Sequence, residues 1–506
     1  MTGPRGVLVT EPMTAPTLED IVAAADLLEA VVEDRGVLGL ADEDVRKRLL
    51  IAAGRVSMPL RHERKKLARE LERQRREAKR SRDMEKRMQT GIRTLRDHPI
   101  FVTPEAGAPR EPVGDLGLEL EEARRCYVCK TNYTRLHHFY DQMCVACGEF
   151  NYAKRRPEAD LSGRVALVTG ARVKIGYHAA IMLLRSGAHV IVLTRFPRDA
   201  AARYAREPDF VDWRDRLEIH GIDLRHSPSV ELLCRELLSS HSRLDFIINN
   251  ACQTVRRPPA FYGHLLDGET KPLHLLPAAE AALVAGDHGP RTRNALPKDF
   301  GDSSQDARAA MLSQVPLIPE DLGAGGELFP AGQLDADLQQ VDLRETNSWR
   351  LMLDQVPTIE LLEVHLVNAV APFILNGRLR PLMRAVPTAD KHIVNVSAME
   401  GQFYRALKTT RHPHTNMAKA SLNMMTRTAA ADYIEDGIHM NSVDTGWVTD
   451  EDPALLAARK AVEQAFSPPL DIVDGAARIV DPIYVGFQTG VHPWGMFFKD
   501  YAETPW

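Results

Sequence analysis

Cysteine is scarce in this chain, with six residues in a sequence of 506. The N-terminal segment also lacks the charged stretch followed by an apolar one that marks a secretory signal. These two absences argue against a small extracellular fold held together by disulfides, because such folds combine export with dense cysteine. We expect a cytoplasmic protein with reduced thiols.

Long apolar runs and internal repeats are absent too. No uninterrupted apolar stretch approaches the roughly 18 residues that a membrane-spanning helix needs, and no repeat with a period of about 20–50 residues is apparent. These absences argue against a membrane protein and against a solenoid. Hydrophobic residues make up 44% of the chain and charged residues 26%, as in ordinary soluble proteins. The length suits two or three domains.

Four of the six cysteines fall in one short segment. They are Cys126, Cys129, Cys144 and Cys147, spaced as CxxC–x14–CxxC. Two such pairs bring four thiolates to one tetrahedral Zn²⁺ ion, and four protein ligands predict a structural rather than a catalytic site. Disulfides are the main alternative, and His137 and His138 are alternative ligands. We interpret residues 101–160 as a zinc-ribbon-like module that recognises a macromolecule or docks on its neighbour; we favour docking.

Residues 1–100 predict helices with segregated charge. Apolar spacing indicates one helix over Leu18–Val32, beginning at Thr17, and a second over Asp42–Val56. The run Arg61–Arg96 contains fifteen Lys or Arg and six Asp or Glu, a net charge of +9 in a chain of net charge −5. This basic helix binds nucleic acid or another polyanion, or packs along an acidic protein surface. We favour the acidic protein surface.

The stretch 163–250 has the pattern of a dinucleotide-binding βα repeat. Val165–Thr169 is a short β-branched run typical of a strand that is buried on both faces. Gly170 allows a tight turn, and Gly176 lets the next helix begin close to the strand with its amides directed at an anion. The segments HVIVLTR, GIDLR and LDFIINNA follow in order. We expect an α/β fold with a doubly wound parallel sheet; a domain of this kind without a nucleotide is the alternative.

These motifs resemble the short-chain dehydrogenase/reductase family from about Leu161 to the C-terminus. The family loop TGxxxGxG corresponds to Thr169–Gly176, and the family NNAG turn to Asn249–Cys252. The remaining family positions correspond to Asp223 after a strand, Asn368, Ser397, Thr415, Lys419 and Thr445. The resemblance implies a Rossmann-type oxidoreductase domain over 161–506.

The resemblance also implies a cofactor site, with two departures. Lys174 replaces the middle glycine of the loop, and Arg195 follows the second strand, where NAD-preferring members carry Asp. With Arg172, these cations suit a 2′-phosphate, which favours NADP over NAD. The alternative is that Lys174 obstructs the site. The expected cofactor-binding residues are Gly170, Arg172, Lys174, Ile175, Gly176, Arg195, Asp223, Asn250 and Lys419.

The expected catalytic set has one serious departure. The resemblance implies that Ser397 polarises the substrate oxygen, Lys419 holds the nicotinamide ribose and Asn368 supports a proton relay. Thr415 stands where the family has its catalytic Tyr, and an aliphatic hydroxyl lacks the acid chemistry of a phenol. Tyr404 is the first candidate for this role, and the imidazoles of His412 and His414 are the others.

A large insertion separates Asn250 from Asn368, at about 256–347. It leaves the sheet at the carboxyl end of a strand, where substrates bind in open α/β sheets. We therefore expect a lid over the nicotinamide position or a platform for a partner.

Two functions follow from these features. The first is an atypical NADP-dependent oxidoreductase acting on a small-molecule carbonyl or alcohol, with the homodimer common in the family. The second is a non-catalytic nucleotide-binding sensor or scaffold that uses the zinc module and the basic helix to bind a macromolecule. Thr415 and Lys174 favour the second function, whereas the set Ser397, Lys419, Asn368 and Asn250 favours the first. We favour the enzyme.

Overall fold

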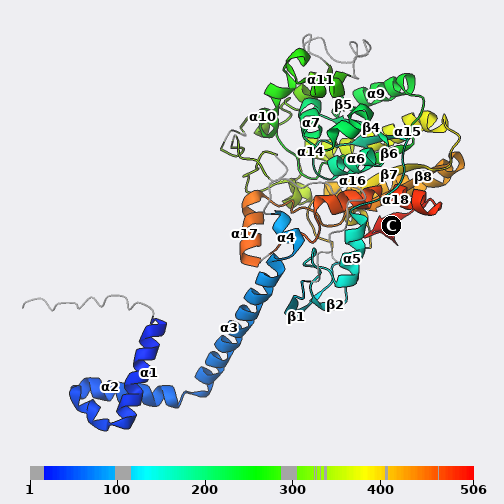
Figure 1. Ribbon diagram of the computed structural model, residues 1–506. Coiled ribbons are helices and arrows are strands. Elements are labelled where there is room, and N and C mark those ends of the chain that lie inside the picture. Colours follow the sequence, from blue (N-terminus) through cyan, green and yellow to red (C-terminus); the bar gives the residue numbers. More distant parts are fainter. Residues whose placement is uncertain are drawn as a thin grey trace, which may run out of the picture. The chain divides into compact units, whose positions relative to one another are not determined.

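The computed structural model describes residues 16–96, 116–285, 305–323, 325, 327–330, 332–335, 339–404, 408–464 and 466–506. The chain forms two compact units, Met1–Arg80 and Ser81–Trp506 (Figure 1). The central part of the expected insertion, residues 286–304, lies outside the described residues.

The first unit is helical, as its apolar spacing indicates. Helix α1 (Leu18–Glu33) begins at Thr17, whose hydroxyl accepts a bond from the backbone of Asp20 while the Asp20 carboxylate bonds back. Helix α2 (Glu43–Ser57) begins after Asp42, whose carboxylate caps it. The expected helix starts are confirmed. Within the described residues, neither helix has a buried side chain.

The second unit is built on a mostly parallel sheet of eight strands in the order β10-β9-β8-β7-β6-β3-β4-β5. The strands are β3 (Val165–Thr169), β4 (His189–Thr194), β5 (Leu217–Gly221), β6 (Phe246–Asn249), β7 (Lys391–Ser397), β8 (Ile438–Asp444), β9 (Phe497–Lys499) and β10 (Ala502–Thr504). The strand order reverses beside β3, because β4 lies on one side of it and β6 on the other. The α/β doubly wound Rossmann-type fold that we expected is confirmed.

Two apolar layers cover the two faces of this sheet. In β3, Ala166 and Val168 pack in one layer, whereas Leu167 packs in the other, as alternating side chains of a strand must. Helices α6 (Lys174–Arg185) and α18 (Ile472–Thr489) supply the first layer. Helices α9 (Ser227–Ser240), α15 (Ala371–Arg384) and α16 (Pro413–Tyr433) supply the second. The two layers therefore bury β3 from Ala166 to Thr169, and Val165 at its start is partly buried.

The remaining α-helices range from four residues, in α8, to 28 residues, in α3. They are α3 (Arg61–Met88), α4 (Gly91–Arg96), α5 (Val145–Lys154), α7 (Pro197–Tyr204), α8 (Phe210–Trp213), α10 (Pro259–Glu269), α11 (Ala278–Ala285), α12 (Gln305–Leu312), α13 (Glu320–Gly323), α14 (Thr358–His365) and α17 (Ala454–Gln464).

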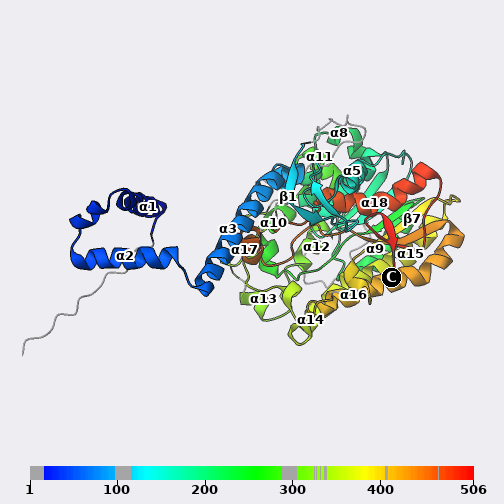
Figure 2. The same cartoon turned by 90° about the horizontal axis from the view of Figure 1, so that it is seen from below.

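Within the second unit, the cysteine-containing segment packs against the Rossmann-type domain. It consists of β1 (Glu119–Arg125), β2 (Asn132–Arg135) and α5, which lies beside α18 in both views (Figures 1 and 2). The contact is buried and charged: Arg155 bonds Asp471 at 2.8 Å and Asp474 at 2.9 Å, and Tyr140 donates to Asp474. This arrangement agrees with docking as the favoured role of the segment.

The end of the basic helix α3 contacts the same segment. Arg82 pairs with Glu121 at 2.6 Å, and the Asp83 carboxylate accepts the backbone amides of Glu121 and Glu122. Arg87 and Arg93 share the buried carboxylate of Asp141. At this end, therefore, the basic helix faces acidic groups of its own chain.

Among the residues that the structure describes, one helical stretch qualifies as a membrane span by length and composition alone. It is Thr358–Arg384, with a mean hydropathy of 1.5 in its most apolar window. Our sequence expectation missed it because charged and polar residues interrupt its apolar run. Leu375 and Leu379 of this stretch are fully buried in the second layer of the core, so sheet packing already accounts for part of its apolar character.

Candidate functional site

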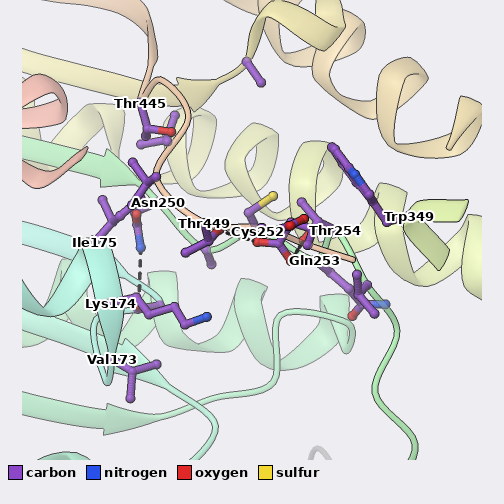
Figure 3. Close-up of a pocket in the computed structure, with 18 of the residues that line it drawn as sticks. Val173, Lys174, Ile175, Asn250, Cys252, Gln253, Thr254, Trp349, Thr445 and Thr449 are labelled. Atoms are coloured by element: carbon purple, nitrogen blue, oxygen red, sulfur yellow. Dashed lines mark hydrogen bonds between the residues drawn. The ribbon is translucent and has the colours of Figure 1, made fainter. Parts of the chain in front are cut away.

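A large pocket lies at the carboxyl edge of the sheet, where the strand order reverses. Its volume is about 1150 Å³, ample for a dinucleotide-sized ligand. The loops after β3, β4, β6, β7 and β8 all line it. Figure 3 shows the part between the glycine-rich loop and the segment Cys252–Thr254. In open α/β sheets this edge is where ligands bind.

The glycine-rich loop keeps the conformation that a phosphate-binding turn needs. Gly170 has a φ of +67°. A Cβ added at Gly176 would lie 2.3 Å from the side-chain amide nitrogen of Asn250 and 2.6 Å from the carbonyl oxygen of Gly170. Helix α6 therefore begins so close to the β3 turn that only glycine fits. Asn250 secures the turn by donating to the carbonyl of Gly170 at 3.2 Å.

Lys174 adopts the left-handed backbone conformation that glycine adopts most easily, with a φ of +57°. The backbone therefore passes this position as a glycine would, at a cost of roughly 1–2 kcal/mol for a side-chain-bearing residue. The Lys174 side chain extends from the loop toward the pocket interior and lines the pocket (Figure 3).

Three arginines gather around one phenol at the β4 side of the pocket. Arg195 donates to the Tyr262 hydroxyl at 2.7 Å and lies 4.5 Å from its ring centroid. Burial acts to raise the pKa of Tyr262, but the positive charges of Arg195 and Arg257 outweigh it and lower this pKa. Arg172 also contributes to this lowering. The pocket is electropositive here.

These three arginines differ in how far their charge is neutralised. Arg172 pairs with Asp199 at 2.6 Å, and Arg257 pairs with Asp342. Among the residues that the structure describes, Arg195 has only the neutral Tyr262 hydroxyl as a side-chain hydrogen-bond partner. Of the three, Arg195 is therefore the one without a carboxylate at ion-pair distance among the described residues, although Asp223 is near enough to interact with its charge.

Asp223, after β5, also lines the pocket, as the family resemblance suggests. The Arg225 guanidinium donates two hydrogen bonds to the Asp223 carboxylate, from Nε at 3.0 Å and from Nη2 at 2.6 Å. Burial acts to raise the pKa of Asp223, but Arg225 outweighs it, so the pKa falls below its ordinary value and the carboxylate stays ionised.

Asn368 lies in a π-helical turn, η7 (Leu366–Val370), between α14 and α15. Its side-chain oxygen accepts the Gln253 amide at 2.7 Å, and its nitrogen donates to the Gln253 carbonyl at 3.1 Å. Asn368 thus holds in place the segment that follows β6, and this segment lines the pocket. Single π-turns within α-helices are frequent at functional sites.

Ser397 and Lys419 come together at the end of β7. Both line the pocket, and Lys419 donates to the carbonyl of Val396 at 2.7 Å. The Ser397 hydroxyl is buried and has no hydrogen-bond partner among the described residues. A buried hydroxyl in this state is available to a ligand oxygen. Thr415 is buried as well, but it does not line the pocket.

The structure separates the three candidates for the missing phenol. Tyr404 is 98% exposed and is not a pocket residue. His414 is buried outside the pocket lining, 3.8 Å from a carboxylate oxygen of Glu360. His412 lines the pocket and stacks on Trp349 with ring centroids 3.9 Å apart. Burial lowers the pKa of His412 to about 4, so its imidazole is neutral near pH 7.

Both ends of the insertion line the pocket. Helix α10 brings Phe261 and Tyr262 against Phe196, which follows β4. Trp349 lies at the other end of the insertion, beside His412. Arg256 anchors the base of the insertion through Asp321 at 2.6 Å and Glu363 at 3.0 Å. The described ends of the insertion therefore line the pocket on the arginine side and beside His412.

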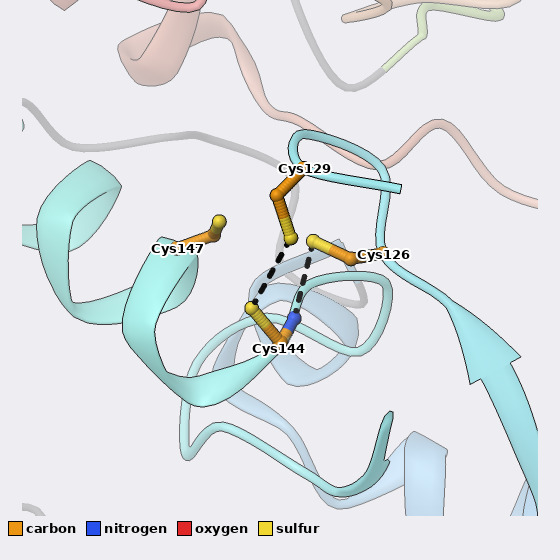
Figure 4. A group of neighbouring side chains, drawn as sticks. All are labelled: Cys126, Cys129, Cys144 and Cys147. Carbon is orange, nitrogen blue, oxygen red and sulfur yellow. Dashed lines mark hydrogen bonds between the residues drawn. The ribbon is translucent and has the colours of Figure 1, made fainter. Parts of the chain in front are cut away.

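The four clustered cysteines converge on one point (Figure 4). Their sulfur atoms all lie within 4.8 Å of one another, and Cys129 and Cys144 are 3.7 Å apart. Four thiolates about 2.3 Å from one Zn²⁺ ion would be roughly 3.8 Å apart, so the geometry fits. The Cys144 amide donates to the Cys126 sulfur at 3.4 Å, a bond that stabilises thiolate charge.

The nearby histidine His137 is a poor substitute ligand. Its Nδ1 accepts the backbone amides of Phe139 and Tyr140, at 3.0 and 3.2 Å. The neutral ring must therefore carry its proton on Nε2, which leaves no lone pair there for a metal. The four cysteine sulfur atoms are therefore better placed than His137 to hold a metal ion together.

Sequence reasoning missed two pocket residues, Tyr127 and Arg257. Arg257 lies in the segment RRPPAFYGHLL at the start of the insertion, and nothing in that segment predicts that Arg257 joins Arg195. Tyr127 lies inside the first CxxC pair, and nothing in the sequence connects it with the Rossmann-type domain. Only the docking of the cysteine segment brings it to the pocket.

Two family models match the chain. The model described as short chain dehydrogenase matches residues 164–262, and the model described as enoyl-(acyl carrier protein) reductase matches residues 352–467. Most of the expected insertion lies between these matches. These matches and the relatives below support a member of the short-chain dehydrogenase/reductase family, through residues 164–262 and 352–467.

Individual relatives are distant or short. The uncharacterized protein R665 of Acanthamoeba polyphaga mimivirus is 28% identical over 382 residues, 73% of each chain. Retinol dehydrogenase 14 of Mus musculus is 36% identical over 102 residues, which cover 18% of this chain and 30% of that protein. The solved RhlG/NADP active-site complex of Pseudomonas aeruginosa is 18% identical with a TM-score of 0.40, covering 67% of this chain and 95% of that chain.

Proposed function

We propose that this protein is an NADP(H)-dependent oxidoreductase that interconverts a small-molecule carbonyl and alcohol. The observation that carries this proposal is the pocket itself, which joins the glycine turn, the Arg195 group, Ser397 and Lys419 along one sheet edge. A fold without a ligand would have no need of all four groups in one cavity. Asp223 and Asn368 stand at the positions that the family resemblance implies.

Different residues bind different parts of the dinucleotide. The amides at the start of α6 face the pyrophosphate, with Lys174 as an added cation. Arg195 binds the 2′-phosphate, and Asp223 lies at the adenine side. Lys419 binds the nicotinamide ribose from its place beside Val396. When bound, the cofactor supplies or accepts the hydride.

The protein residues orient the substrate and move the proton. The Ser397 hydroxyl donates to the substrate oxygen, which polarises the carbonyl as negative charge develops on it. His412 acts as the proton relay in place of the family Tyr, because it lines the pocket whereas Tyr404 and Thr415 do not. A neutral imidazole can accept a proton at one nitrogen and release one from the other.

Steady-state kinetics with NADPH and a panel of carbonyl substrates test this proposal. Ser397→Ala should lower kcat at least 100-fold with little change in NADPH affinity. His412→Phe should lower kcat and keep the stack on Trp349, whereas Tyr404→Phe and Thr415→Val should change kcat less than twofold. Equal activity of wild type and Ser397→Ala would contradict the proposed reaction.

The four thiolates bind one structural Zn²⁺ ion in this proposal. The convergence of their sulfur atoms supports it, and four protein ligands leave no position for substrate. Zinc analysis of protein purified without chelator should give one ion per chain. The thiol-rich site also supports a cytoplasmic location, which subcellular fractionation can test.

A homodimer through α14, α15 and α16 is the proposed assembly. These helices expose Leu362, Phe373, Met417 and Met424, each more than half exposed. Apolar side chains in such a group are typical of an interface. Light scattering of the purified protein should give twice the chain mass of 56.5 kDa, and Phe373→Glu should give the monomer.

The second candidate function is a non-catalytic sensor that binds NADP(H) and engages a macromolecule. Thr415 favours it, since this residue lacks the acid chemistry of the family Tyr. Under this alternative, NADPH would bind but no substrate would be turned over, and Ser397→Ala would have no consequence. Binding and turnover measured on the same preparation separate the two functions.

A further inference from the structure

The first CxxC pair lies against the pocket as well as in the thiolate cluster. Cys126 and Cys129 enclose Tyr127, and Tyr127 and Lys130 both line the pocket. We propose that metal binding by the four thiolates holds Tyr127 against the loop after β8 and thereby completes the wall of the cofactor pocket that this loop forms. This inference rests on the proposed function in assigning the pocket to NADP(H).

The hydroxyl of Tyr127 contacts the loop directly. It accepts the backbone amide of Trp447 at 3.1 Å, and a Cβ added to Gly446 would lie 3.1 Å from it. Gly446 itself has a φ of +76°. The loop therefore makes a tight turn against the phenol. The pocket residues Thr445 and Thr449, labelled in Figure 3, belong to the same loop.

The cysteine segment also packs against the glycine-rich loop of the pocket. Its apolar cluster includes Val448 from the β8 loop, and Ile175 from the glycine-rich loop packs against the same cluster. Ile175 lines the pocket. Two walls of the pocket, one at the pyrophosphate and one after β8, therefore rest on the cysteine segment.

The thiolate cluster determines where Tyr127 lies. The Cys126 amide donates to the Thr131 carbonyl at 2.8 Å, and Lys130 takes a φ of +64°, so the chain makes a tight knuckle around Tyr127. Without a cation, four sulfur atoms this close would repel one another as thiolates, or lose their charge by protonation. A bound Zn²⁺ ion removes both difficulties and fixes the knuckle.

Tyr127 is a positioning residue in this account. It acts on the cofactor through the Gly446–Trp447 backbone, so its removal should alter cofactor affinity without removing zinc. Tyr127→Phe deletes the hydroxyl and keeps the ring. Tyr152→Phe is the matched control, because Tyr152 packs against the same apolar cluster but does not line the pocket.

The experiment uses full-length protein in three forms: zinc-loaded, zinc-free after chelation, and reloaded with Zn²⁺. Hydrogen exchange at the Trp447 amide and NADPH affinity are measured on each form and on both variants. We expect zinc removal to accelerate exchange at Trp447 and to weaken NADPH binding at least tenfold, with recovery on reloading. Tyr127→Phe should retain one zinc per chain, accelerate exchange at Trp447 and weaken NADPH binding at least threefold; Tyr152→Phe should do neither.

Three results would overturn the inference. They are a protein that takes up no zinc, a rate of hydrogen exchange at the Trp447 amide that does not change on zinc removal, and a Tyr127→Phe variant with wild-type exchange and NADPH affinity. Failure of the proposed function is a distinct result. If zinc-loaded wild type binds no NADPH, the cofactor assignment is wrong, and zinc-dependent exchange at Trp447 alone then decides whether the knuckle positions the loop.

Discussion

Replacing Arg195 by Gln tests the assignment of the 2′-phosphate. Arg172 and Arg257 are already paired with carboxylates, whereas within the described part of the chain the Arg195 guanidinium donates only to the Tyr262 hydroxyl, at 2.7 Å. Arg195 should therefore contribute most of the discrimination between NADPH and NADH. The variant keeps much of the side-chain volume and removes the charge.

The magnitude follows from the bond that is lost. A hydrogen bond to a charged group contributes about 1.5–3 kcal/mol, which corresponds to a loss of about 10-fold to 150-fold in affinity. NADPH should bind more weakly by this factor, and NADH, which lacks the phosphate, should change less than about twofold. The preference for NADPH should fall accordingly.

Fluorescence titration of each variant with both cofactors measures the effect. Arg378→Gln is the control, because Arg378 is an exposed arginine paired with Glu231 and does not line the pocket. If NADPH and NADH weaken equally in Arg195→Gln, the residue supports the fold rather than the phosphate. If neither cofactor changes, the phosphate lies elsewhere and the assignment is refuted.

Three further substitutions test the structure around the site. Gly176→Ala should abolish NADPH binding and destabilise the fold by about 1–3 kcal/mol, since its Cβ would lie 2.3 Å from the Asn250 amide nitrogen; a denaturant titration with stability equal to wild type would contradict this packing. Lys174→Gly should stabilise the protein by about 1–2 kcal/mol by relieving a left-handed residue, while NADPH affinity falls; a gain in affinity would mean that Lys174 obstructs the site. Arg155→Met should cost about 3–5 kcal/mol, because two buried aspartates lose their cation; a thermal melt within one degree of wild type would show that this network contributes little.

The sequence predicted those parts of the fold that depend on local pattern. Strand β3 could be located from its β-branched run, and the turn from Gly170 and Gly176, because period and glycine chemistry act over a few residues. The cysteine spacing likewise predicted the convergence of four sulfur atoms, since each CxxC pair forms its own knuckle.

Contacts between distant segments could not be predicted in the same way. Arg257 joins Arg195 only because α10 folds back on β4, and Tyr127 reaches Trp447 across 320 residues of sequence. The choice among Tyr404, His412 and His414 also depended on how one loop packs against Trp349. Sequence spacing carries no information about such packing. The sequence shows that the loop of Tyr404 is long enough to fold back, but not whether it does.

The central claim is that the pocket binds NADP(H), and direct titration tests it best. Trp349 and Trp447 both line the pocket, so bound NADPH should quench protein fluorescence and gain emission by energy transfer. We predict saturable binding with a micromolar Kd for zinc-loaded wild type, and a loss of at least tenfold in Lys419→Ala. No saturable binding of NADPH or NADH to wild type would contradict the account.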